Sequence, residues 1–106
     1  MVYDLLAKQR LVEMEAELNK TKDPVERIYL WFAFIRHFSV ETQNSFNKHY
    51  EEFVQLCEDY VTTPDPLARR EIRKTIKVVA VELQHLNDIM TRVSGIQRKL
   101  ESDLLL

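Results

Sequence analysis

Apolar residues recur every three or four positions along most of the chain, which is the spacing of one face of an α-helix. In the first 20 residues the positions with this spacing are Tyr3, Ala7, Leu11, Met14 and Leu18. The pattern predicts a first helix over residues 2–20, which the polar segment Lys20-Thr21-Lys22 ends.

A second helix is predicted to start at Asp23 and Pro24. Aspartate caps a helix N-terminus, and proline is tolerated in the first turn because its missing N–H would have no partner there. Glu26 follows Asp23 by three residues, as in a capping box. The helix is then apolar on two faces, one with Val25, Ile28, Tyr29, Phe32 and Ile35 and the other with Trp31, Phe34 and Phe38. We therefore expect it to be covered on two sides.

The middle of the chain contains its poorest helix-forming segment, residues 39–45, which lacks an apolar stripe. We expect a break or a kink there. A new stripe with helical spacing follows, formed by Phe46, Tyr50, Phe53, Cys57 and Tyr60. This stripe predicts that the chain is helical again up to about residue 62.

The last helix is predicted to be the longest, with Asp65 as its N-cap and Pro66 as its first residue. Heptad spacing is kept without a miss by Ile72, Ile76, Val79, Leu83, Leu86, Met90 and Val93. Ser94 and Gly95 interrupt the helix propensity, so we expect a helix to about residue 94 and a bend or a frayed extension after it.

These elements predict an all-α fold, an antiparallel three- to four-helix bundle with a long C-terminal helix, in a single domain of residues 1–106. Residues 66–104 would span about 58 Å as a helix, and residues 24–62 nearly the same. A turn at 63–65 would fold them into a matched antiparallel pair, and the first helix would cover half of their groove. A loop at 39–45 gives a short four-helix bundle, whereas a kink gives an elongated three-helix rod.

The composition excludes several function classes. One glycine and three prolines are too few for the turns of a multi-stranded sheet, for a Gly-rich phosphate loop or for a dinucleotide fingerprint. A net charge of −2 argues against binding nucleic acid along the whole surface. The single cysteine, Cys57, excludes an internal disulfide and fits a reducing compartment, so we expect a cytoplasmic protein. The longest apolar run, residues 28–35, is too short to span a membrane.

A cluster of positive charge lies early in the last helix, at Arg69, Arg70, Arg73, Lys74 and Lys77. Positive charge near a helix N-terminus opposes the macrodipole. One explanation is an anionic partner, such as phosphate, RNA or an acidic helix. The other lies across the turn, because an antiparallel hairpin sets Glu58 and Asp59 opposite the start of this cluster and Glu51 and Glu52 near its end.

The residues that could carry catalysis form no recognisable site. Glu82 and His85 have the Glu-x-x-His spacing of helical di-iron sites, but such a site needs the motif twice and the chain has it once. His37, His49 and His85 also lack the sequence context of a phosphotransfer histidine. Cys57 lies on an apolar stripe and is expected to be a buried thiol. We therefore predict no catalytic residue, no metal, no cofactor and no enzyme activity.

The aromatic residues Trp31, Phe34 and Phe38 are the least ordinary feature. They could fill the core of one chain, form a protein–protein interface or line a pocket for a small ligand or lipid. We predict a non-enzymatic protein–protein interaction module, an oligomeric scaffold or adaptor, most simply a homodimer built on these three residues. Trp31→Ala should then shift the oligomer before it unfolds the chain. The alternative is a regulator that binds anions or nucleic acid through the basic start of the last helix.

Overall fold

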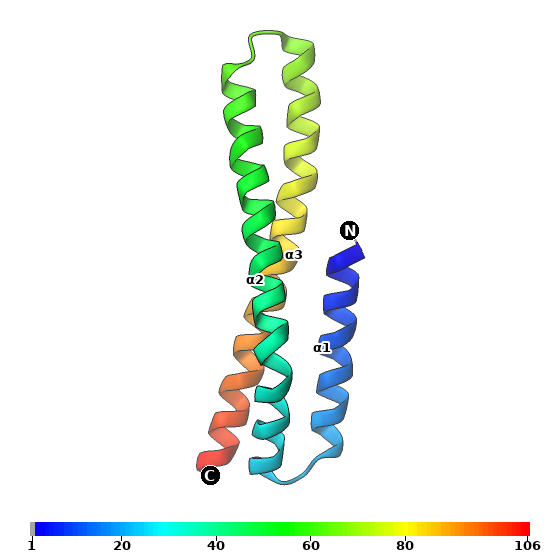
Figure 1. Cartoon of the computed structure of the whole chain (residues 1–106), viewed down its shortest axis with the longest axis vertical. Helices are drawn as coiled ribbons and strands as arrows, with labels where there is room; N and C mark the ends of the chain where they lie inside the picture. The colour runs from blue at the N-terminus through cyan, green and yellow to red at the C-terminus, as the bar shows by residue number, and fades with distance from the viewer. Residues whose placement is uncertain (1) are drawn as a thin grey trace.

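The computed structural model describes the backbone of residues 2–106 and the side chains of residues 6–106. Within this range the chain forms three helices, α1 (Val2–Lys20), α2 (Pro24–Thr62) and α3 (Pro66–Leu105), and no strand. Helices α2 and α3 form a long antiparallel hairpin, and α1 lies beside one half of it (Figure 1). The molecule measures 61 × 22 × 18 Å. The all-α prediction is confirmed, and the helices pack as a helical bundle.

Both predicted helix starts are confirmed at atomic detail. The carboxylate of Asp23 accepts a hydrogen bond from the backbone N–H of Glu26 at 3.1 Å, and Pro24 opens α2. The carboxylate of Asp65 accepts from the N–H groups of Leu67 at 3.3 Å and Ala68 at 3.4 Å. Each cap satisfies N–H groups that have no partner within their own helix, so these aspartates fix where the long helices begin.

Of the break or kink predicted at residues 39–45, the break is wrong, because α2 continues through this segment. Thr42 faces the neighbouring helix and is only 2% exposed, while its polar neighbours in the sequence lie on the solvent side. Packing against another helix outweighs weak local propensity. The same holds for α3, which continues past Gly95 to Leu105 because Leu100 is buried in the core.

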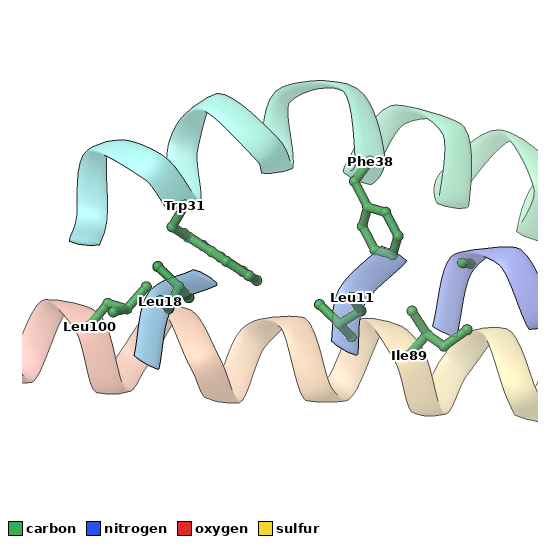
Figure 2. Packing of buried hydrophobic residues seen from close by; sticks show 7 residues of the cluster. Leu11, Leu18, Trp31, Phe38, Ile89 and Leu100 are labelled. Atoms are coloured by element: carbon green, nitrogen blue, oxygen red, sulfur yellow. The ribbon is translucent and has the colours of Figure 1, made fainter. Parts of the chain in front are cut away.

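The core joins all three helices in the half of the hairpin that α1 covers. It is formed by Ala7, Leu11 and Leu18 of α1, Trp31 and Phe38 of α2, and Ile89 and Leu100 of α3 (Figure 2). The predicted stripe of the first helix is thus confirmed at Ala7, Leu11 and Leu18, and Met14 packs against the same core. The side chain of Tyr3 lies outside the described residues.

Charged contacts hold α1 against the hairpin on both sides. Arg10 pairs with Glu41 of α2, and its guanidinium lies 6.0 Å and 5.5 Å from the ring centroids of Phe34 and Phe38. Arg92 of α3 lies 2.7 Å from Glu15. A hydrogen bond to Glu15 and the negative charge of that carboxylate raise the pKa of Arg92 above its usual value. These pairs orient α1, but exposed pairs add little to stability.

Candidate functional site

The aromatic cluster predicted as an interface lies in the interior of the chain. Trp31 is 0% exposed and Phe38 1%, and Phe34 is partly buried against both. The Trp31 indole Nε1 donates a hydrogen bond to Gln97 Oε1 at 3.2 Å, and the rings of Phe34 and Phe38 stack with centroids 4.8 Å apart. Helix α1 covers this cluster, so the three residues form no surface that a partner could reach while α1 is docked. The cluster thus fills the core of the single chain, which is one of the three roles considered for it from the sequence.

In a different part of the molecule, the hairpin is not covered by a third helix from the described residues 2–106. We call residues 43–63 of α2 and 66–86 of α3 the tip half of the hairpin. Helix α1 has its N-terminus halfway along the hairpin and runs away from the tip (Figure 1). In the tip half the buried residues are His49, Val79 and Leu86, which lie on the seam between the two helices. Each helix here has only one covered side, so the rest of its surface meets solvent.

One side of the tip half is apolar. Glu41 marks the side of α2 that faces α1, because it pairs with Arg10. Phe46, Tyr50, Phe53 and Cys57 lie about half a turn away from this side. On α3, Ile76 and Leu83 lie about half a turn away from Arg92, which marks the α1 side of that helix. We call the surface of these six residues, Phe46, Tyr50, Phe53, Cys57, Ile76 and Leu83, the back face.

The back face is partly open to solvent. Tyr50 is 53% exposed, and its ring stacks on Phe46 with centroids 6.2 Å apart. The other members are half-buried, including the free thiol of Cys57, which was predicted to be buried. Val54, beside Tyr50, is 39% exposed and extends the apolar surface. The apolar stripe that starts at Phe46 therefore lies on one side of α2, as predicted, but no other helix in the described chain covers its outer side.

The opposite side of the tip half is mostly polar, with the exposed Val78 lying among its charged residues. It carries Lys48, Glu52, Gln55 and Asp59 from α2, and Glu71, Thr75 and Glu82 from α3. Gln55 Nε2 donates to Asp59 Oδ1 at 3.0 Å, which is a contact within the surface of one helix. Exposed apolar side chains also lie outside the back face, at Leu67, Val78 and Val81, so the back face is distinguished by its continuous stripe from Phe46 to Cys57.

A buried histidine lies on the seam of the tip half. His49 is 8% exposed, and its Nδ1 lies 3.6 Å from Glu82 Oε2 and 3.7 Å from Glu52 Oε2. These distances are those of an ion pair when the imidazole is protonated. Spacing along the sequence paired Glu82 with His85 of its own helix, whereas the structure sets Glu82 against His49 of the neighbouring helix. Within the described residues, no group of three or more His, Cys, Asp or Glu side chains could hold a metal ion.

The positively charged residues at the start of α3 separate into two groups. Arg69, Arg70 and Arg73 line a cleft of about 340 Å³ together with Tyr60 and Pro66. Lys74 and Lys77 do not line it, and Lys74 pairs with Glu71 of its own helix at 3.2 Å.

Tyr60 organises the arginine cleft. Arg69 donates from Nε to the backbone carbonyl of Tyr60 at 3.2 Å, and its guanidinium carbon lies 4.4 Å from the ring centroid. Arg73 donates to the Tyr60 hydroxyl at 3.0 Å and lies 5.5 Å from the same ring. Tyr60 was predicted only as part of an apolar stripe, so its role as the anchor of two arginines was missed. The sequence signal for this contact is that Tyr60 lies nine residues before Arg69, on the other side of the turn from the basic cluster.

The ion pairs expected across the turn do not form. Among the side chains of residues 6–106, neither Glu58 nor Asp59 pairs with a cation of α3. Asp59 accepts hydrogen bonds within its own turn instead, its backbone carbonyl from the Thr63 hydroxyl at 2.6 Å and its carboxylate from Gln55. The arginines of the cleft therefore form no ion pair with these two carboxylates.

The described helices include none that is both long enough and apolar enough to cross a membrane. Searches of protein-family models, of curated proteins and of solved structures each find no match to this chain.

Proposed function

We propose that the chain is a non-enzymatic protein–protein interaction module that self-associates through the back face of its tip half. The proposal rests on one observation: an aromatic and aliphatic surface lies on two helices where no third helix covers it. Burial of such a surface stabilises an assembly by roughly 25 cal/mol per Å². The proposed interface residues are Phe46, Tyr50, Phe53 and Leu83, and they replace the aromatic cluster at 31–38.

A second copy of the chain is the occupant that fits this surface. An antiparallel copy centred between Tyr50 and Phe53 sets the stripe from Phe46 to Cys57 against the same stripe, apolar against apolar. Two-fold pairs in which both copies use the same surface are the commonest protein oligomers. The tip halves would then form a four-helix arrangement, with α1 of each copy outside it.

The positions of the charges favour the antiparallel pair over the parallel one. A parallel pair would bring the arginine clefts of both copies to the same end, where like charges repel. In the antiparallel pair Arg69 lies near the level of Asn87 of the second copy. The two clefts are then about 25 Å apart along the helices, well beyond the screening length of about 8 Å in physiological salt.

Sedimentation equilibrium of the full chain at tens of micromolar tests the proposal. We expect a mass of twice 12.7 kDa. Tyr50→Glu should shift the equilibrium to the single chain, because it places a charge in the apolar centre of the pair. Its helical content and unfolding midpoint at low protein concentration should stay close to those of the parent, since Tyr50 is exposed in the single chain.

Val81→Glu is the matched control. Val81 is 48% exposed, much like Tyr50, but it lies on α3 outside the back face. The control should remain associated. A parent chain of 12.7 kDa across the whole concentration range would contradict the proposal, as would equal dissociation of both variants.

A further inference from the structure

The arginine cleft at the tip brings the side chains of three arginines together at one surface. Among the side chains of residues 6–106, no carboxylate pairs with Arg69, Arg70 or Arg73. Among the other arginines, Arg10, Arg27 and Arg92 each have a carboxylate partner, whereas the described side chains give Arg36 and Arg98 none. Three unpaired guanidinium groups at the positive end of a helix repel one another, and an anion would relieve that repulsion.

The geometry of the cleft leaves donors free for such an anion. Arg69 donates its Nε–H to the Tyr60 carbonyl, and Arg73 donates one N–H to the Tyr60 hydroxyl. Most N–H groups of both guanidinium groups are therefore available to bind an anion. The Tyr60 hydroxyl accepts from Arg73 and keeps its own hydrogen to donate. The two guanidinium groups are held by Tyr60, which lowers the entropy cost of binding with them.

The backbone at this helix start offers no anion site of its own. The Asp65 carboxylate already accepts from the N–H groups of Leu67 and Ala68, and Pro66 has no N–H. Binding must therefore come from the side chains that line the cleft.

From these observations we infer that the cleft of Tyr60, Arg69, Arg70 and Arg73 binds a terminal phosphate group. A phosphate monoester carries a charge of about −1.5 to −2 at neutral pH and three acceptor oxygens, which matches several guanidinium forks better than a single carboxylate does. The ring of Tyr60 already carries Arg69 and Arg73, so it offers little surface for stacking a nucleobase. The phosphate itself, rather than a base, is the group recognised.

The site belongs to the single chain and does not depend on self-association. It can therefore be tested in the Tyr50→Glu variant, so that failure of the pairing and failure of this site are separate results. The probe is inorganic phosphate, titrated into the full chain in a low-chloride buffer and followed by amide chemical shifts. We expect saturable shifts confined to the end of α2 and the first two turns of α3, and binding of acetate at least about tenfold weaker.

Two matched double variants locate the site. Arg70→Gln with Arg73→Gln and Lys74→Gln with Lys77→Gln each remove two positive charges from exposed positions of α3. The arginine variant should bind phosphate about tenfold or more weakly, since it loses charge-assisted hydrogen bonds. The lysine variant should bind within about twofold of the parent, and Tyr60→Phe should bind several-fold more weakly. Shifts that never saturate, or equal losses in the two double variants, would overturn the inference.

The source of the phosphate group is settled with vesicles. Vesicles containing phosphatidic acid present a phosphate monoester on a surface, and those containing phosphatidylglycerol present only a diester. Retention on the first that inorganic phosphate reverses, without retention on the second, assigns a lipid headgroup. Phosphate binding in solution without retention on either assigns a soluble ligand, and equal retention on both indicates a diffuse charge effect that contradicts the site.

Discussion

Trp31 shows most clearly how one side chain supports the fold. It is fully buried between α1 and α3, and its only polar atom is satisfied by Gln97. Loss of so large a buried side chain leaves a cavity and removes the hydrogen-bond donor of Gln97 Oε1.

Trp31→Ala should therefore lower the free energy of unfolding by about 3–5 kcal/mol, a large share of the total for a chain of this size. Urea unfolding at low protein concentration measures this loss. Trp31→Phe keeps most of the ring volume and should cost clearly less. A Trp31→Ala chain that kept its stability but changed its oligomeric state would restore the aromatic interface that the sequence first suggested.

For individual residues, the sequence could predict some roles and not others. Spacing placed Trp31 and Phe38 on one apolar stripe, and the capping aspartates Asp23 and Asp65 were found from their types alone. Spacing could not show what covers the stripe, because coverage depends on where α1 docks. It also could not show that Tyr60 anchors Arg69 and Arg73, since that contact joins two helices across a turn.

At the scale of the element, local propensity misjudged where the long helices end. Polar residues at 39–45 and the pair Ser94–Gly95 weaken an isolated helix, but in the folded chain they lie on helices already held by Phe38 and Leu100. Tertiary packing stabilises a helix through segments that would not form one alone.

Gly95 offers a direct test of helix continuity in α3. It lies inside the helix, and a methyl group added there meets no atom within 4 Å. Gly95→Ala should therefore stabilise the chain by about 0.5–1 kcal/mol, because alanine loses less backbone freedom on folding. Thermal unfolding by circular dichroism measures the gain. A destabilised variant would argue for a bend at this position.

Asn44 tests the continuity of α2 in the same way. It is exposed and lies within the segment where a break or a kink was expected. Asn44→Pro should cost about 3 kcal/mol or more, because proline removes a hydrogen bond of the helix interior and clashes with the preceding turn. Asn44→Ala, the control, should be neutral or slightly stabilising. Little effect of proline in urea unfolding would indicate a loop at this position.

At the scale of the whole molecule, the decisive feature is an asymmetry between the two halves of the hairpin. One half has three helices and a shared core, and the tip half has two helices with an apolar back face and an arginine cleft (Figure 1). The sequence already predicted this asymmetry, because the first helix is long enough to cover only half of the groove between the two long helices. Its consequence, an uncovered surface at Phe46 to Cys57, required knowing which sides of α2 and α3 face α1.

Small-angle scattering with mass determination tests the central proposal most directly, because it measures shape and subunit number together. The single chain is 61 Å long. An antiparallel pair that overlaps over the tip halves should have twice the mass and a longest dimension of about 90 Å, since an overlap of some 20 residues spans about 30 Å. A particle of 12.7 kDa and about 61 Å would contradict self-association, and one of twice that mass but still about 61 Å long would contradict the antiparallel overlap.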